Sequence, residues 1–246
     1  METRVNEMGK LSLTESGDAL CLGTDAVLLS AYIKKNASAS ALELGAGSGA
    51  ISLLVAKRGN FKKIKAVEIQ PELAEICRKN AFENGFSDII ETVCEDVRRI
   101  NPAEYSGISV VFANPPYMKN DSGKVSPSAA RQASRHEVFG GIKEFCACAG
   151  KILKTGGRFY TVYRPDRLES LICALAEYGF TPKRMTFVSS DAEHEPSVVL
   201  TEAVKDAKES LFITPPLFLT KDGSPTGDAE YIYENGAFPE KFILRK

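Results

Sequence analysis

The stretch ALELGAGSGAISLLVAK, residues 41–57, decides the fold that we expect for the chain. Residues 41–44 have the length and composition of a buried strand, and this strand stops at a cluster of glycines. Residues 51–57 then have the composition of a helix. Glycines between a strand and a helix permit a tight turn and a close approach to the backbone, and the helix start presents free N–H groups. The stretch predicts a strand, a turn open to a ligand, and a helix; a purely structural turn is the alternative.

The same alternation continues along the chain. Pro71 suits the first position of a second helix, Asn84 and Gly85 suit its end, and Gly150 is the expected end of a later helix. Strands that alternate with helices form a mostly parallel sheet with helices on both faces, so the predicted fold class is α/β. The runs rich in apolar and β-branched residues predict seven strands, at 41–44, 65–69, 89–94, 109–113, 158–163, 183–189 and 198–204.

The chain shows no internal repeat and no low-complexity linker. We therefore expect one domain over residues 1–246, with an N-terminal extension at 1–36 and a C-terminal appendage of strands and turns at 211–246. Oligomeric state cannot be predicted from these patterns.

Composition excludes several classes of protein. Apolar residues make up 43% of the chain and charged residues 26%, which is ordinary for a globular protein, and a net charge of −1 excludes a globally basic nucleic-acid binder. No apolar run approaches the roughly 18 residues of a membrane span, and the N-terminus lacks an export signal, so we expect a cytoplasmic protein. Six scattered cysteines and two histidines complete no zinc set, so no metal site is expected.

Polar side chains lie at the carboxyl ends of four predicted strands, at Glu43, Glu68, Asp96 and Asn114. In a parallel sheet, ligands bind beyond the carboxyl ends of the strands. A carboxylate such as Glu68 can accept hydrogen bonds from both hydroxyl groups of a ribose, and Asp96 can accept one from an adenine amine. Each acid alone could be an ordinary charge at a helix start, and Glu95 leaves the adenine contact open by one position. Together they predict a nucleoside-containing cofactor without a pyrophosphate; NAD is the competing class.

The sequence Asn-Pro-Pro-Tyr at 114–117 follows the fourth strand. The lone pair of an amine such as adenine N6 is delocalised into the ring, which makes the nitrogen a poor nucleophile. The side-chain oxygen of Asn114 and the carbonyl of Pro115 could accept hydrogen bonds from its two N–H groups. The prolines would fix the direction of these acceptors in advance of the reaction. Tyr117 could stack on an extruded base. The predicted catalytic residues are Asn114, Pro115, Pro116 and Tyr117. Their chemistry requires an acceptor nitrogen that is planar, of the N–C=N or N–C=O type, and does not specify which one.

The segment after this motif carries four cations and one acid, Asp121, among glycine, proline and small residues. It predicts a loop that tracks phosphates. The expected RNA-binding residues are Lys119, Lys124, Arg131 and Arg135, whereas His136 is not predicted to be catalytic.

The ordered set of E-x-G-x-G-x-G at 43–49, an acid after each of the next two strands and N-P-P-Y resembles the motifs of class I S-adenosylmethionine-dependent methyltransferases. The resemblance implies the Rossmann-like fold of that class, with seven strands, and S-adenosyl-L-methionine as cofactor. It implies that the methionine part lies at Glu43, Gly45, Ala46 and Gly47, the ribose at Glu68 and Ile69, and the adenine at Asp96 and Val97, with Asn114 also beside the cofactor.

Three further segments resemble a bacterial family that methylates N6 of the adenine just 3′ of the anticodon in valine tRNA. They are LCLGTDAVLLSAY (20–32), GKVSPSAARQASRHE (123–137) and PPLFLTKDGSPTGDAEYIY (215–233), and with N-P-P-Y they extend the similarity over nearly the whole chain. The resemblance implies a tRNA substrate and puts Thr24 and Asp25 near the methionine end of the cofactor; Asp25 as a helix cap is the alternative.

Similar N-P-P-Y motifs occur in enzymes that act on other acceptors. One alternative is methylation of a glutamine amide in a protein, as in release factors, although such an enzyme would carry an added N-terminal helical domain. Methylation of N6 of adenine in another RNA or in DNA is a second alternative, and an RNA-binding protein without turnover is a third.

Overall fold

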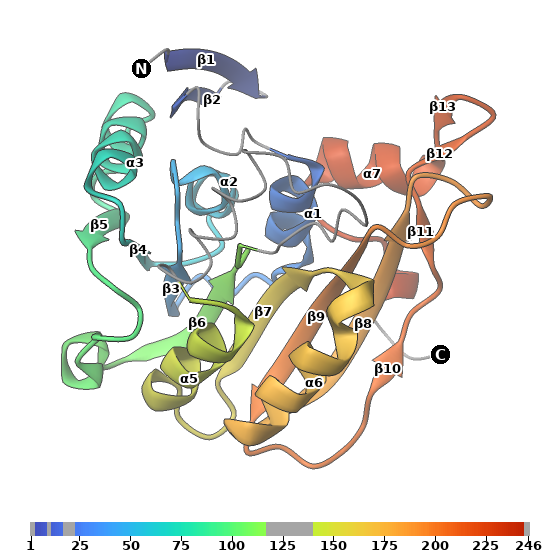
Figure 1. The fold of residues 1–246 in the computed structure, drawn as a ribbon. Coiled ribbons are helices and arrows are strands. Elements are labelled where there is room, and N and C mark those ends of the chain that lie inside the picture. Colours follow the sequence, from blue (N-terminus) through green and yellow to red (C-terminus); the bar gives the residue numbers. More distant parts are fainter. Residues whose placement is uncertain (1–2, 9–10, 17–22, 117–139, 244–246) are drawn as a thin grey trace, which may run out of the picture.

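The computed structural model describes residues 3–8, 11–16, 23–116 and 140–243, and its centre is a twisted sheet (Figure 1). The strand order is β10-β8-β9-β7-β6-β3-β4-β5, and β11 also pairs with β8. These strands are β3 (Ser40–Leu44), β4 (Lys63–Glu68), β5 (Ile90–Cys94), β6 (Ile108–Ala113), β7 (Arg158–Tyr163), β8 (Phe180–Ser189), β9 (Val198–Lys205), β10 (Phe212–Ile213) and β11 (Leu217–Phe218).

The predicted mostly parallel sheet is confirmed. Strands β3 to β7 run parallel to one another, and β9 is antiparallel to both β7 and β8. All seven predicted strands are present, with ends that shift by a few residues. Within the described ranges the sheet has nine strands rather than seven, because β10 and β11, two short strands from the C-terminal segment, pair with the outer strand β8. The chain crosses from β3 to β4 on one side, whereas β6 lies on the other side of β3.

Helices cover both faces of the sheet (Figure 1). Buried side chains of α1, α2, α3 and α7 form the core on one face, and those of α5 and α6 form the core on the other. The helices are α1 (Thr24–Tyr32), α2 (Ala50–Lys57), α3 (Pro71–Glu83), α5 (Ile142–Ile152), α6 (Leu168–Glu177) and α7 (Gly227–Asn235), with short 3₁₀ turns η1 (Pro102–Tyr105), η2 (Pro165–Arg167) and η3 (Glu240–Phe242).

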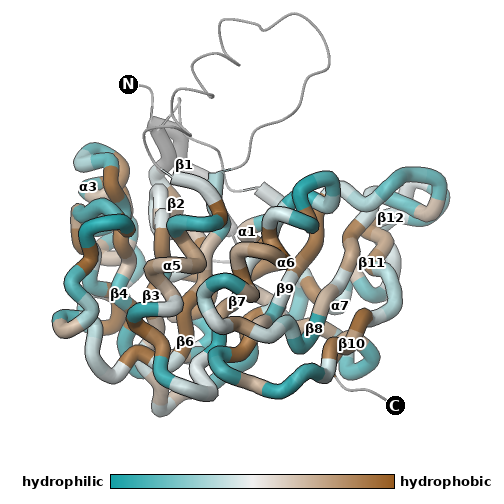
Figure 2. Tube along the Cα trace, turned by 60° about the horizontal axis from the view of Figure 1, so that its bottom comes forward, coloured by the Kyte–Doolittle hydropathy of each residue, from teal (hydrophilic) through white to brown (hydrophobic). Residues whose placement is uncertain are grey.

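The central strand β6 shows why both faces must be covered. Val110 and Phe112 belong to the core on the α1 face, whereas Val111 and Ala113 belong to the core on the α5 face. Successive side chains of a strand point to opposite faces, so a strand buried on both sides is apolar throughout. Figure 2 shows the hydrophobic stretches along the central strands and the hydrophilic ones on the outer turns.

Several expectations were wrong or incomplete. Gly150 does not end α5 but lies inside it. A Cβ at this position would stand 3.0 Å from the carbonyl oxygen of Tyr178, so glycine permits close packing of the helix against that residue. Helix α7 was not predicted in the C-terminal segment; Thr226 caps it by accepting a hydrogen bond from the Ala229 N–H at 3.2 Å. The hairpin of β1 (Thr3–Met8) with β2 (Leu11–Ser16) was not predicted either. The strands and turns expected at 211–246 include the hairpin of β12 (Thr220–Lys221) with β13 (Ser224–Pro225).

Candidate functional site

The register of the parallel strands gathers the predicted site at one edge of the sheet. Leu44 of β3 is paired with Val67 of β4 on one side and with Ala113 of β6 on the other. Gly45, Glu68 and Asn114, the next residues along these strands, therefore lie side by side at the carboxyl ends. This edge contains the point where strand order reverses, between β3 and β6, which is where open α/β sheets bind ligands.

The glycine loop, residues 45–49, joins β3 to α2. Its three glycines have φ between +56° and +82°, a region that other residues rarely adopt. A Cβ at Gly49 would stand 2.6 Å from Sγ of Cys77 on α3, so the loop is packed tightly there. A Cβ at Gly47 would meet no heavy atom within 4 Å, which leaves the loop backbone open to a ligand at this position.

Glu68 holds the glycine loop against the end of β4. Its side chain is buried, and its two carboxylate oxygens accept hydrogen bonds from the N–H of Gly47 at 2.8 Å and from the N–H of Gln70 at 2.9 Å. Each oxygen keeps a second lone pair for another donor. Glu68 therefore lies against the glycine loop, and the half-buried Ile69 follows it directly; their contacts with a ribose stay a prediction.

Glu43 is buried beneath the loop and contacts α2. Its carboxyl accepts hydrogen bonds from the N–H of Ser52, at 3.1 Å, and from the Ser52 hydroxyl. Burial raises the pKa of Glu43 to about 8, and the charge of Glu68 adds to the rise. In this structure Glu43 therefore fastens the first turn of α2 to the end of β3; its contact with a cofactor stays a prediction.

Two neighbouring acids follow β5, and the structure separates their contacts. Glu95 accepts a hydrogen bond from the hydroxyl of Tyr105 at 2.8 Å. Asp96 is held by Arg98 through Nε and Nη2 at 2.6–2.9 Å, and these bonds keep the pKa of Asp96 below its usual value. The buried Val97 lies between Asp96 and Arg98 in the chain. Sequence reasoning missed Arg98, although its D-x-R spacing is a signal for such a pair.

Asn114 and Pro116 are half-buried after β6, and Pro115 is buried between them. The other residues predicted to act on the substrate, Tyr117, Lys119, Lys124, Arg131 and Arg135, lie outside the described residues, as does His136. At the start of α1, Thr24 is exposed and Asp25 is half-buried in the first turn. Gly23 is the N-cap residue, so Asp25 is not the helix cap.

Asn80 on α3 is a site residue that sequence reasoning missed. Its fully buried side chain donates from Nδ2 to the carbonyls of Ser48 and Thr14, both at 2.9 Å, and accepts from the N–H of Thr14 at 2.8 Å. It thereby connects strand β2 to the glycine loop. Asn84, one turn later, makes the equivalent pair of bonds to Ser12. Two asparagines four residues apart, one in the helix and one at its C-cap, on a helix that has a buried face, were the available signal.

Across the described helices, no stretch combines the length and hydropathy of a membrane-spanning segment. In the same part of the chain, no three His, Cys, Asp or Glu side chains gather as metal ligands would.

Comparisons with known proteins agree with this geometry. The model of the family described as methyltransferase small domain matches residues 16–171. A protein of Porphyromonas gingivalis strain W83, named tRNA1(Val) (adenine(37)-N6)-methyltransferase, is 30% identical over 209 residues, which cover 82% of this chain and 81% of the relative. A protein of the same name from Phocaeicola vulgatus is 32% identical and covers 74% of this chain and 76% of its own length.

Among solved structures, a predicted O-methyltransferase, protein Atu636 from Agrobacterium tumefaciens, superposes with a TM-score of 0.69 at 22% identity. The match covers 88% of this chain and 98% of that one. At this identity the likeness concerns the fold alone, and it confirms the predicted methyltransferase fold.

Proposed function

Because the chain belongs to the methyltransferase small domain family, we propose that it methylates N6 of the adenine just 3′ of the anticodon in valine tRNA, with S-adenosyl-L-methionine as methyl donor. The chain is an S-adenosylmethionine-dependent N6-adenine methyltransferase. The observation that carries the proposal is the register that sets Asn114, with its two prolines, beside the glycine loop at the point where strand order reverses.

The residues at this edge fit the cofactor. The open Cβ position of Gly47 lets a ligand approach the backbone, and Glu68 beside it keeps lone pairs for the ribose hydroxyls. The lowered pKa of Asp96 keeps that carboxylate ionised as an acceptor for an adenine amine. When bound, S-adenosylmethionine supplies the methyl group of its sulfonium as an electrophile.

The chain contributes orientation at the acceptor nitrogen. The Asn114 side-chain oxygen and the Pro115 carbonyl accept hydrogen bonds from the two N–H groups of the adenine amine. These bonds favour a pyramidal nitrogen whose lone pair is free to attack the methyl group. Proline fixes its own φ and restricts the residue before it, so these acceptors are held in place before the substrate arrives. We assign base stacking to Tyr117 and phosphate contacts to Lys119, Lys124, Arg131 and Arg135. The reaction is proposed to take place in the cytoplasm.

The test is incubation with unmodified total tRNA and methyl-labelled cofactor, followed by nucleoside analysis. We expect label in N6-methyladenosine of a valine tRNA. Asn114→Ala should lower kcat by about 10²–10³-fold, the size of effect seen when one preorganised hydrogen-bonding group is removed from an active site. Label in protein, or equal transfer by Asn114→Ala, would contradict the proposal.

The matched control is Asn235→Ala. Asn235 is exposed on α7, and its side chain donates only to the Tyr231 carbonyl one turn earlier, at 2.9 Å, among the described contacts. Its removal should leave the rate of methyl transfer unchanged.

A further inference from the structure

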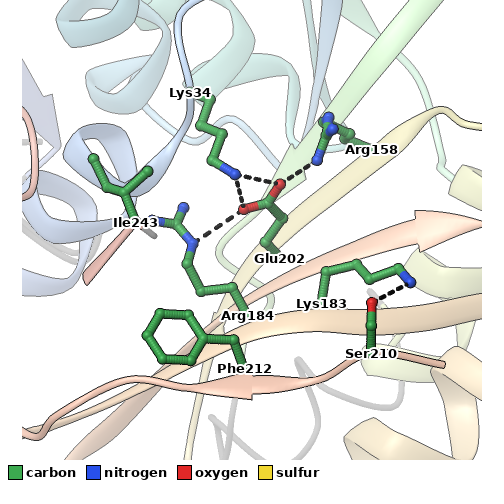
Figure 3. Close-up of a pocket in the computed structure, with 8 residues that line it drawn as sticks. All are labelled: Lys34, Arg158, Lys183, Arg184, Glu202, Ser210, Phe212 and Ile243. Atoms are coloured by element: carbon green, nitrogen blue, oxygen red, sulfur yellow. Dashed lines mark hydrogen bonds and ion pairs between the residues drawn. The ribbon is translucent and has the colours of Figure 1, made fainter. Parts of the chain in front are cut away.

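A second charged site lies on the α1 face of the sheet, where Arg184 donates to the carbonyl of Tyr32. Figure 3 shows the residues that line it. At its base, Glu202 of β9 and Arg184 of β8 are 1% and 4% exposed and form an ion pair of 3.0 Å. Lys34, which follows α1, contacts the same carboxylate at 3.1 Å, and Arg158 at the start of β7 contacts it as well. Three cations therefore share one carboxylate.

The site is an open pocket of about 300 Å³ with an excess of positive charge. Among the described residues, its lining adds Lys183, Ser210, Phe212 and Ile243 to the four charged groups, which gives a net charge of +3. Arg184 also donates to the carbonyls of Tyr32 and Phe242, so each nitrogen of its guanidinium already has a partner within the protein. Lys34 and Arg158 differ, because their side chains are 41% and 43% exposed at the rim.

The position of the pocket relative to the site edge follows from the register. Arg158 is paired with Val110, four residues before Asn114, so the pocket is displaced by roughly 13 Å along the strands. Helix α1 spans a similar length of about 14 Å, from Thr24, which is predicted to lie near the cofactor, to Tyr32, two residues before Lys34. A polymer substrate with one base at Asn114 can therefore extend a part of its backbone to this pocket.

We propose that the pocket formed by Lys34, Arg158, Lys183, Arg184 and Glu202 binds a phosphate group of the RNA backbone; the identity of the ligand as RNA rests on the proposed function. A phosphate brings the negative charge that the lone carboxylate does not supply. The planar fork of Arg158 suits two phosphate oxygens, and Lys183, which donates to Ser210 at 2.8 Å, adds a point charge at the other wall.

The first experiment uses inorganic phosphate and needs no RNA. At constant ionic strength, replacement of chloride by phosphate should raise the Tm of the wild-type protein, and Lys183→Gln and Arg158→Gln should lose most of this rise. Among the described residues, Lys183 donates to the Lys208 carbonyl and to Ser210 rather than to Glu202, so its variant tests the pocket without disturbing the buried ion pair. The same Tm rise in both variants would overturn the proposal.

The second experiment measures the Kd for unmodified tRNA, with S-adenosylhomocysteine present, as a function of salt. We expect each variant to bind several-fold more weakly and its slope of log affinity against log salt to fall by about 1, because one phosphate contact is lost. With saturating tRNA, kcat should stay at the wild-type value. Unchanged tRNA affinity and slope in variants that have lost the phosphate response would overturn the assignment to RNA and leave a small phosphorylated ligand.

Arg78→Gln is the matched control. Arg78 is an arginine paired with a single glutamate, Glu75, on the exposed side of α3, and its loss should change neither readout. A wild-type protein that shows the phosphate response but transfers no methyl group to tRNA would contradict the proposed function and leave the phosphate site standing.

Discussion

Glu43 is the residue whose protonation should dominate the pH dependence of stability near neutrality. Its pKa of about 8 in the folded chain is above the ordinary value of 4.5. Between these two values the folded state holds a proton that the unfolded state has released, so the free energy of unfolding falls as pH rises. The contribution is complete below pH 4.5 and is lost as pH passes through about 8.

We therefore expect Glu43→Gln to flatten this dependence. Wild type should lose stability on the order of a few kcal/mol across the window, since one pKa unit corresponds to about 1.4 kcal/mol, and the variant should not. Urea unfolding at a series of pH values measures the difference. Glu75→Gln, on the exposed face of α3, is the control and should keep the wild-type slope; an equal slope in Glu43→Gln would disprove the assignment.

Gly49 and Gly47 allow the cost of close packing to be separated from that of backbone strain. Both have positive φ, but only a Cβ at Gly49 would strike a neighbour, Cys77 Sγ. Each alanine should cost about 1–2 kcal/mol for the left-handed conformation. Gly49→Ala should cost about 1–3 kcal/mol more for overpacking.

The measurement is the free energy of unfolding in urea for both single variants and for Gly49→Ala combined with Cys77→Ala. The double variant should recover part of the overpacking cost, because the sulfur is gone. If Gly47→Ala and Gly49→Ala are equally unstable, the contact with Cys77 has no energetic importance.

On the level of elements, the hairpin β1–β2 acts on the glycine loop through Asn80. Asn80→Ala leaves the buried backbone groups of Thr14 and the Ser48 carbonyl without their partner, which should destabilise the fold by about 1–3 kcal/mol. Because Ser48 belongs to the loop, we also expect weaker binding of S-adenosylhomocysteine, measured by calorimetry.

Asn84→Ala provides the comparison, because Asn84 binds the same strand at Ser12 and has no hydrogen bond to the glycine loop among the described contacts. It should lower stability but leave the Kd for S-adenosylhomocysteine near the wild-type value. Equal Kd values for the two variants would mean that Asn80 is a structural residue only.

Most elements could be predicted because their signals are local. Pro71 and Gly85 bound α3, and the apolar runs of β3 and β6 mark strands buried on both faces. The hairpin β1–β2 was missed, and the strands expected in the C-terminal segment were not foreseen as part of the main sheet, because short strands depend on partners far away in sequence, here α3 and β8.

The arrangement of the site was predictable where it depends on the order of the strands. The order of strands placed Glu68 and Asn114 beside the glycines, because parallel strands end at one edge. The partners Ser52, Arg98 and Asn80 were not foreseen, since side-chain hydrogen bonds depend on how helices and loops are seated in three dimensions.

For the molecule as a whole, Glu202 joins parts of the chain that are distant in sequence. Through Arg184, Lys34 and Arg158 it links the end of α1, strands β7 to β9 and η3. Burial raises its pKa, but the three cations outweigh burial and hold the pKa below its usual value. This contribution to stability is present above the ordinary pKa and is lost in acid.

Glu202→Gln should lower the free energy of unfolding by about 3–5 kcal/mol, because the buried Arg184 loses its counter-charge. Glu234→Gln, at an exposed position of α7, is the control and should have little effect in urea unfolding. If both variants unfold alike, the ion pair does not hold these parts together.

The predicted single domain over residues 1–246 stays a prediction, which one cooperative unfolding transition would support.

The hydrogen bond between the Gly47 N–H and Glu68 has a consequence for turnover. The two bonds to the Glu68 carboxylate fix its position before any ligand arrives. If Glu68 binds the ribose as proposed, the hydroxyls use the second lone pair of each oxygen, and no hydrogen bond within the loop has to break. The glycine loop would then keep the same shape when the donor is loaded and when S-adenosylhomocysteine is released, so that no refolding of the loop delays the next cycle.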